Sequence, residues 1–261
     1  MVDPHEGIDE RTATRVVLYH GDGADDRASA LPDRHRKEAA IDLYEVMRTA
    51  FAAREYTGEE LPDDVLYEIL DHARFAPSGG NRQGNRVIVV RDPATREQLA
   101  RLAEPAAKRY RAQVQAGERP WNTIVPTRVT DEQVATTPAP PGLVEPFRTA
   151  SVVLVFVVDL KVVASMDQHL DRIGLISGAS IYPFVWNVLL AARQAGFGGT
   201  ITTMAVAEEP NVQALLHIPA DHAVAAIVPL GKPVKQLAKL RRRPVEEIAT
   251  REFFDGPAFG K

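Results

Sequence analysis

The most informative part of the sequence is the run Ala76-Pro77-Ser78-Gly79-Gly80-Asn81-Arg82-Gln83. Proline and glycine at this density are typical of a loop. A helix is expected before the loop, because apolar residues recur at helical spacing after Pro62, which suits a first helical turn. These apolar residues are Val65, Leu66, Ile69, Leu70 and Ala73. The apolar run 87–90 predicts a short buried strand after the loop.

The segments before and after this loop predict a mixture of helices and strands. Helices are expected over about 41–52, 62–76, 94–116, 172–195 and 209–216, and strands over 87–90, 152–158, 200–204 and 223–228. The helix over 172–195 is apolar nearly all round, which is typical of a helix buried in a core or between subunits. Because the strands and helices do not follow a regular βα order, the expected fold class is α+β.

Two segments lack a regular pattern. Residues 1–40 are polar and charged, which indicates an N-terminal arm or a disordered leader before a folded domain over 41–261. Residues from about 117 to 149 hold many of the prolines and read as irregular. Stretches of this kind are usually functional lids or disordered, so we interpret this one as a lid-like insertion, with Tyr110 and Trp121 nearby, that sets substrate choice. A loose surface insertion explains the prolines equally well.

Charge and hydropathy exclude several kinds of partner. The net charge of -4 gives no electrostatic basis for binding nucleic acid or an anionic membrane surface. The first residues lack the apolar core of a signal peptide, and no stretch is long and apolar enough to span a bilayer. We therefore expect a cytoplasmic protein that binds neither nucleic acid nor membrane.

The sequence lacks the residues that several classes of enzyme and metal site require. Cysteine is absent from the sequence, which excludes disulfides, thiolate nucleophiles and cysteine-ligated zinc. His169 between Asp167 and Asp171 is the nearest approach to a metal cluster, but a solvated helix edge explains it as well, and we expect no metal site. The run Gly196-Phe197-Gly198-Gly199 follows a helix and precedes a strand, the reverse of the Rossmann order, so Gly196 is interpreted as a helix cap.

Three segments stand in a characteristic order and spacing. They are Arg54-Glu55-Tyr56-Thr57 with Leu61-Pro62-Asp63-Asp64, the loop 76–83, and the late run from Ala195-Gly196-Phe197 through Pro229-Leu230-Gly231-Lys232-Pro233 to Arg241-Arg242-Arg243-Pro244. Together they resemble the FMN-dependent nitroreductase family. The resemblance covers about residue 42 to the C-terminus, without the proline-rich stretch. Its most specific part is Ala-Pro-Ser-x-x-Asn-x-Gln after an amphipathic helix.

The resemblance implies a nitroreductase-like fold, with a central, mostly antiparallel sheet flanked by helices in an intertwined homodimer. Each dimer would hold two FMN molecules at the subunit interface, with both chains contributing to each site. NADPH or NADH would reduce the flavin and leave, and a nitroaromatic, a quinone or a similar small acceptor would then take the electrons in a ping-pong cycle. No catalytic side chain is expected, because the flavin carries the hydride chemistry.

The resemblance also implies a set of cofactor-binding residues. They are Arg54, Arg241 and Arg242 at the phosphate, Pro77, Ser78 and Gly79 beneath the flat ring, Asn81 and Gln83 at its polar edge, and Thr200, Ile201 and Thr202 beside flavin N5. Guanidinium groups suit a phosphate dianion. A solvated surface explains the arginine run as well, and an ordinary turn explains the prolines and glycines of the loop but not its Asn-x-Gln.

Two departures from the family pattern affect the expected site. Many relatives carry Arg-x-Ser-x-Arg where this chain has Ala50-Phe51-Ala52-Ala53-Arg54, so one phosphate-binding arginine and a serine hydroxyl are absent. Arg48 is a candidate replacement on a different helical face. The usual Gln-Pro-Trp is replaced by Gln83-Gly84-Asn85, which removes an aromatic ring.

Other functions stay open at this point. One is different flavin chemistry in the same fold, either reductive dehalogenation or oxygen-dependent flavin breakdown. Another is a flavin-binding protein without turnover, in keeping with the missing phosphate arginine.

Overall fold

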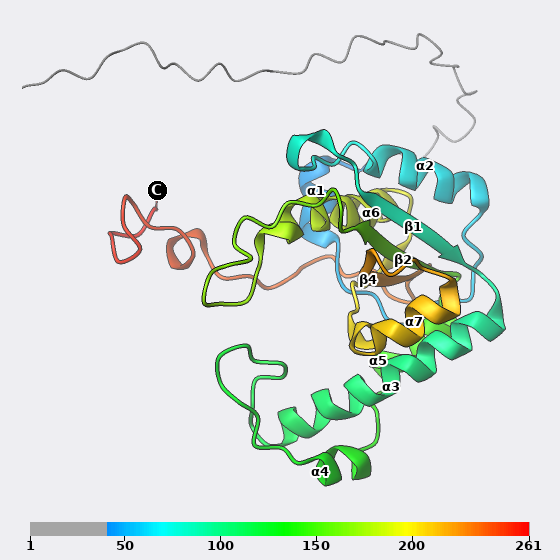
Figure 1. Cartoon of the computed structure of the whole chain (residues 1–261). Helices are drawn as coiled ribbons and strands as arrows, with labels where there is room; N and C mark the ends of the chain where they lie inside the picture. The colour runs from blue at the N-terminus through cyan, green and yellow to red at the C-terminus, as the bar shows by residue number, and fades with distance from the viewer. Residues whose placement is uncertain (1–40, 261) are drawn as a thin grey trace, which may run out of the picture. The chain divides into compact units, whose positions relative to one another are not determined.

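The computed structural model describes residues 41–260, and the predicted N-terminal arm over residues 1–40 lies outside them. The described part contains a four-stranded sheet in the order β1-β2-β4-β3, and every neighbouring pair is antiparallel (Figure 1). The strands are β1 (Asn85–Val90), β2 (Val152–Asp159), β3 (Gly198–Gly199) and β4 (His222–Gly231). Together with the helices around the sheet, this confirms the predicted α+β class and the mostly antiparallel arrangement.

The helices occupy both sides of the sheet (Figure 1). They are α1 (Leu43–Thr49), α2 (Asp63–Ala73), α3 (Pro93–Gln115), α4 (Asp131–Thr136), α5 (Pro141–Thr149), α6 (Tyr182–Gln194) and α7 (Glu209–Leu216). Short 3₁₀ turns are η1 (Gly79–Asn81), η2 (Ile176–Ser180), η3 (Met204–Glu208) and η4 (Val245–Glu247).

Strand β2 lies at the centre of the core. Its residues 152–158 are all at most 3% exposed, as expected for a β-branched apolar run that is covered on both faces. Leu154 and Phe156 pack with α2 and α6, whereas Val153 and Val155 point the other way and pack with α3, α5 and α7. Because side chains alternate along a strand, the single strand β2 contributes to both hydrophobic clusters.

The stretch 117–149 is not irregular throughout, so this prediction is wrong in part. Helix α4 begins with a capping box, in which the Thr130 side chain and Gln133 satisfy each other's backbone N–H groups. Helix α5 begins with Pro141 at a position where a missing N–H costs nothing, and it buries Phe147 completely. The irregular part is confined to 116–130 and 137–140.

Two other predicted elements have different bounds. The expected helix over 172–195 begins only at Tyr182, because the preceding residues form the turn η2 and a loop held by Asp167. The expected strand over 200–204 is also wrong. Strand β3 ends at Gly199, and the only ladder contact within residues 200–204 is the bridge from Thr202 to Ile227. The chain then turns into η3.

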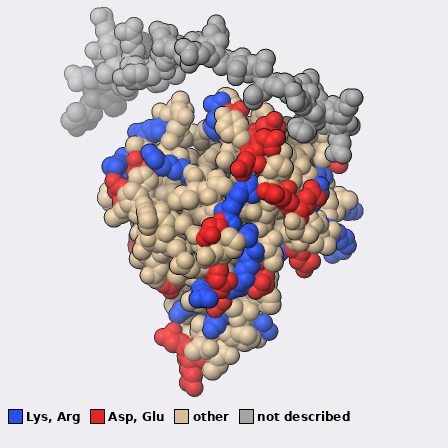
Figure 2. All heavy atoms as spheres, turned by 90° about the vertical axis from the view of Figure 1, so that its right-hand side faces the viewer, with Lys and Arg blue, Asp and Glu red and all other residues tan. Residues whose placement is uncertain are grey.

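Charged side chains of both signs intermingle on the face shown in Figure 2. Ion pairs among the described residues include Arg91 with Asp63, and Arg148 with its three glutamate partners. No helix within 41–260 has the length and apolar character needed to cross a membrane.

Candidate functional site

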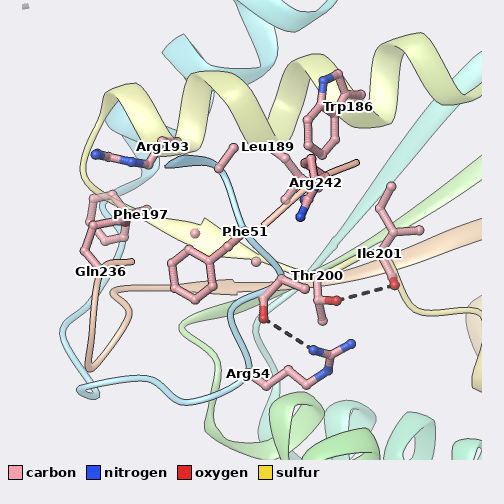
Figure 3. A pocket seen from close by; sticks show the side chains of 14 residues that line it. Phe51, Arg54, Trp186, Leu189, Arg193, Phe197, Thr200, Ile201, Gln236 and Arg242 are labelled. Carbon is pink, nitrogen blue, oxygen red and sulfur yellow. Dashed lines mark hydrogen bonds between the residues drawn. The ribbon is translucent and has the colours of Figure 1, made fainter. Parts of the chain in front are cut away.

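A cavity of about 290 Å³ lies where the segment 50–54, β3, the last turns of α6 and the C-terminal chain meet (Figure 3). Its lining residues are Ala50, Phe51, Ala52, Arg54, Trp186, Leu189, Arg193, Phe197, Gly198, Gly199, Thr200, Ile201, Gln236 and Arg242. Residues far apart in the sequence therefore converge on one hollow, which contains both aromatic side chains and guanidinium groups.

The glycines of β3 allow the cavity wall to form. A Cβ atom on Gly199 would lie 2.5 Å from the Pro229 carbonyl oxygen, so only glycine fits against β4 at this position. The Gly199 carbonyl in turn accepts a hydrogen bond of 3.1 Å from the Ala53 N–H. This bond holds the chain beside β3 just before Arg54. Gly196, with φ of +79°, ends α6 as predicted, so the glycine run serves packing and capping.

Tyr56 anchors the chain immediately after Arg54. Its hydroxyl lies 2.9 Å from the carbonyl oxygens of both Ala53 and Pro229 and is shared between them. Burial raises the pKa of Tyr56, and the nearby Arg54 charge only partly opposes this, so the phenol stays neutral. A Cβ atom on Gly231 would lie 2.9 Å from the Tyr56 ring, which explains why the Pro-Leu-Gly element needs its glycine.

Three guanidinium groups line the cavity, those of Arg54, Arg193 and Arg242 (Figure 3). Their contacts are weak or leave nitrogens free: Arg54 donates a 3.4 Å bond to the Ala52 carbonyl, and Arg193 Nε donates a 3.0 Å bond to Thr49 Oγ1. Within residues 41–260, no carboxylate lies within 4.0 Å of any of the three. This part of the cavity is therefore cationic and suited to an anion.

Arg193 was missed by the sequence analysis. A basic residue in the last turn of a helix is usually explained by the helix dipole, so its position carried no specific signal. The proposed substitute Arg48 is exposed and lies outside the cavity lining. Arg193 thus occupies the cavity where the sequence analysis had looked to Arg48.

Apolar and neutral side chains complete the lining. Trp186 and Leu189 of α6 and Ile201 after β3 provide apolar surface, and Phe51 is also present (Figure 3). Gln236 is held by the hydrogen bond from its Nε2 to the Thr49 carbonyl, at 3.0 Å. The cavity therefore combines a cationic part with flat, apolar surfaces.

The structure divides the predicted site residues into two groups. Arg54, Thr200, Ile201 and Arg242 line the cavity, whereas the others do not. The residues outside it are Pro77, Ser78, Gly79, Asn81 and Gln83 in the loop before β1, together with Thr202 and Arg241. Thr202 instead pairs with β4, and the Arg241 carbonyl accepts a hydrogen bond from Arg242.

The loop before β1 has an ordered but exposed conformation. Ser78 Oγ accepts a 3.0 Å bond from the Gln83 N–H, and the Gly79 N–H donates to Ser180 Oγ at 3.0 Å. Asn81 and Gln83 have φ angles of +52° and +49°, which are unfavourable for residues with a Cβ atom. Both side chains are exposed. The loop is therefore held in a strained shape that presents its two amides to the surface.

His169, Asp167 and Asp171 do not form a group of three candidate metal ligands, and the described residues contain no other such group. The Asp167 carboxylate instead accepts hydrogen bonds from the Leu175 N–H and from Arg172, both at 2.7 Å. The Leu175 N–H and the Arg172 guanidinium lower the pKa of Asp167 to about 2. Asp167 thus organises the loop before η2.

Comparison with known proteins identifies the family. Residues 47–232 match the model of the nitroreductase family. The chain belongs to the nitroreductase family. The predicted family is confirmed, and with it the broader expectation of a flavin oxidoreductase of this family.

Relatives within the family carry different names. The chain is 23% identical to an iodotyrosine deiodinase from Nematostella vectensis over 95% of this chain and 92% of the relative. It is 29% identical to an NADH dehydrogenase from Thermus thermophilus over 75% of this chain and 88% of the relative.

Solved structures share the fold. An oxidised iodotyrosine deiodinase bound to FMN and 3-iodo-L-tyrosine matches with a TM-score of 0.59 at 21% identity, covering 82% of this chain and all of that one. An NADPH:FMN oxidoreductase from Vibrio harveyi complexed with NAD⁺ matches with a TM-score of 0.58 at 19% identity, covering 82% and 78% of the two chains. These similarities support the fold alone. The reaction of this chain has to be inferred from its own residues.

Proposed function

We propose that this protein is an FMN-dependent oxidoreductase that acts as a homodimer. The observation that carries the proposal is the group of three arginines in one cavity of a nitroreductase-family chain, without carboxylate partners in the described part. An FMN phosphate is a dianion, and guanidinium groups bind it by short charge-assisted hydrogen bonds. Arg54, Arg193 and Arg242 would hold this phosphate.

The rest of the cavity fits the remaining part of FMN. Trp186, Leu189 and Ile201 offer apolar surface to a flat ring system, and Thr200 and Ile201 line the same cavity. FMN supplies the hydride chemistry when it is bound, so these residues need only bind and orient it. A backbone N–H beside flavin N5 would favour the electron-rich reduced form.

A second copy of the chain would complete the site. The loop carrying Asn81 and Gln83 does not line the cavity of its own chain, yet its amides are exposed and its backbone is held by the bond from the Gln83 N–H to Ser78. Large apolar side chains are also exposed on α1, around η2 and α6, and in the C-terminal chain after β4. They include Leu43, Tyr44, Met47, Leu175, Tyr182, Trp186, Val245, Ile248, Phe253 and Phe254. This much exposed apolar surface favours an interface between two copies.

The proposed electron donor is NADPH or NADH, and the proposed acceptor is a nitroaromatic, a quinone or a similar small molecule. An open cavity at a subunit interface allows donor and acceptor to occupy the same place in turn, as a ping-pong cycle requires. The NADH dehydrogenase relative supports a nicotinamide donor. Among the described residues that line the cavity there is no Asp, Glu or His.

Reductive dehalogenation is a second candidate function. Several relatives are iodotyrosine deiodinases, and the one from Nematostella vectensis aligns over almost the whole chain. Iodide release from 3-iodo-L-tyrosine by the reduced protein would support this function. Reduction of a nitroaromatic without iodide release would support the first.

The visible spectrum of the purified protein tests the main proposal. We expect flavin absorbance that is bleached by anaerobic addition of NADPH or NADH and returns when an acceptor is added. If the protein binds flavin that neither nucleotide bleaches, it is a flavin-binding protein that does not use NADPH or NADH as its donor. A colourless protein that takes up no added FMN would refute the proposal.

A further inference from the structure

A second hollow, of about 620 Å³, lies at the C-terminal end of α3 and shares no lining residue with the first cavity. Its lining residues are Arg109, Gln113, Gly117, Glu118, Arg119, Trp121, Asn122, Val125, Pro126, Thr127 and Arg128. The last two turns of α3 contribute Arg109 and Gln113, and the loop between α3 and α4 contributes the other lining residues; Figure 1 shows the course of both segments. The hollow belongs to the irregular part of the proline-rich stretch.

Internal hydrogen bonds fix the shape of this loop. Glu118 accepts bonds from the Thr127 hydroxyl at 2.6 Å and from the Arg128 N–H at 2.7 Å, which closes the loop at its base. Asn122 Oδ1 accepts bonds from the N–H groups of Ile124 and Val125, at 2.8 and 2.7 Å. The hollow is therefore formed before any ligand arrives, and binding would cost little ordering of the chain.

Trp121 is held in an unfavourable conformation inside this loop. Its φ angle is +55°, a region that a bulky side chain adopts only where its surroundings enforce it. Its backbone N–H donates a 3.2 Å bond to Gln113 Oε1, and the Arg109 guanidinium carbon lies 5.8 Å from the ring centroid. Trp121 as a whole is nevertheless 48% exposed. An aromatic face is thus presented in the hollow with a cation beside it.

The polar groups of the hollow are arranged for an anion. Gln113 is only 4% exposed, and its side chain serves the loop: its Oε1 accepts the bond from the Trp121 backbone N–H, and its hydrogen bond to Glu118, after that of the Thr127 hydroxyl, helps to lower the pKa of that carboxyl. Arg119 has no carboxylate within 4.0 Å in the same part of the chain, and Arg128 is 4.0 Å from Glu118. Arg109 is paired only with Asp131, whose side chain is 96% exposed. The carboxylate of Glu118 is occupied by the loop itself, so the arginines leave an excess of positive charge.

We propose that this hollow is a binding site for a planar aromatic anion, such as a substituted benzoate. Trp121 would stack with the ring, and Arg119 and Arg128 would bind the carboxylate. A small inorganic anion would leave the indole unused, and an uncharged aromatic compound would leave the arginines unused. The proposal does not depend on flavin binding, because none of these residues lines the flavin cavity.

Isothermal titration calorimetry of the full chain with 4-nitrobenzoate tests the proposal. We expect the uncharged 4-nitrobenzyl alcohol and the non-aromatic cyclohexanecarboxylate each to bind about tenfold more weakly than 4-nitrobenzoate. If 4-nitrobenzoate does not bind, or if the alcohol binds equally well, the proposal is wrong.

Two substitutions locate the binding site. Arg128→Gln should weaken 4-nitrobenzoate binding about tenfold, and Trp121→Leu about fivefold. The Arg128 side chain is 86% exposed, so its loss should leave the fold intact. Arg111→Gln is the control, because Arg111 is on α3, which forms one side of the hollow, but does not itself line the hollow. Unchanged affinity in both test variants would overturn the proposed location, while flavin content measured on the same samples reports separately on the first cavity.

Discussion

Replacing Arg193 by glutamine tests the cationic part of the first cavity. The Arg193 Nε atom bonds to Thr49, but no described residue accepts a hydrogen bond from its two terminal nitrogens, which are free to bind a phosphate. A hydrogen bond to a charged group contributes ~1.5–3 kcal/mol. Its loss should therefore raise the Kd for FMN about 10- to 150-fold. Glutamine retains some packing and can still bond to Thr49, so the fold should persist.

The assay compares FMN with riboflavin, which has the same ring system but no phosphate. Apoprotein is titrated with each, and quenching of flavin fluorescence reports binding. Arg193→Gln should weaken FMN binding and leave riboflavin binding unchanged. Arg48→Gln is the control, because Arg48 is exposed and lies outside the cavity. Equal weakening of both flavins, or an effect of Arg48→Gln in place of Arg193→Gln, would refute the assignment of Arg193 to the phosphate.

Two further predictions concern the framework of the site. Gly199→Ala should lower the free energy of unfolding, measured in urea, by ~1–3 kcal/mol, because the new Cβ atom would lie 2.5 Å from the Pro229 carbonyl oxygen. Gly142→Ala is the control and should not lower it, because the nearest atom there is 3.9 Å away. Equal effects of the two substitutions would contradict the packing argument. Asp167→Asn should lower Tm at neutral pH. The Leu175 N–H and then a guanidinium hold the pKa of Asp167 at about 2, below its unfolded value, so the wild-type advantage is complete above about pH 4 and disappears as the pH falls toward 2. A Tm difference that does not change with pH would show that the charge is not responsible.

The core could be predicted from the sequence because its signal is local. The run 152–158 is continuous, apolar and β-branched, and such a run is stable mainly as a strand covered on both faces. Helices α2, α3 and α7 were likewise marked by periodic apolar residues, and their observed bounds lie close to the predicted ones. By contrast, the density of prolines concealed α5, although Pro141 occupies a first-turn position that favours a helix.

The cavity could be predicted only in part, because it depends on tertiary contacts. Arg54 and Arg242 were found through the family pattern, but Arg193 enters the cavity because α6 packs beside the segment 50–54. Nothing in the local sequence distinguishes it from an ordinary helix-terminal arginine. The strand expected over 200–204 failed for a related reason: the glycines that allow close packing on β4 end at Gly199.

The strained backbone and the exposed side chains of Asn81 and Gln83 are relevant to the proposed homodimer. Both residues keep left-handed backbone angles, at a cost of ~1–3 kcal/mol each, although their exposed side chains gain little within their own chain. Such a cost persists only where the surroundings enforce it, and here the hydrogen bond from the Gln83 N–H to Ser78 helps to do so. An ordinary helix-to-strand turn could be built without this strain. The loop therefore fits a role in which its amides bind a group outside their own chain, and the flavin cavity of a second copy is the partner that the proposed homodimer would provide.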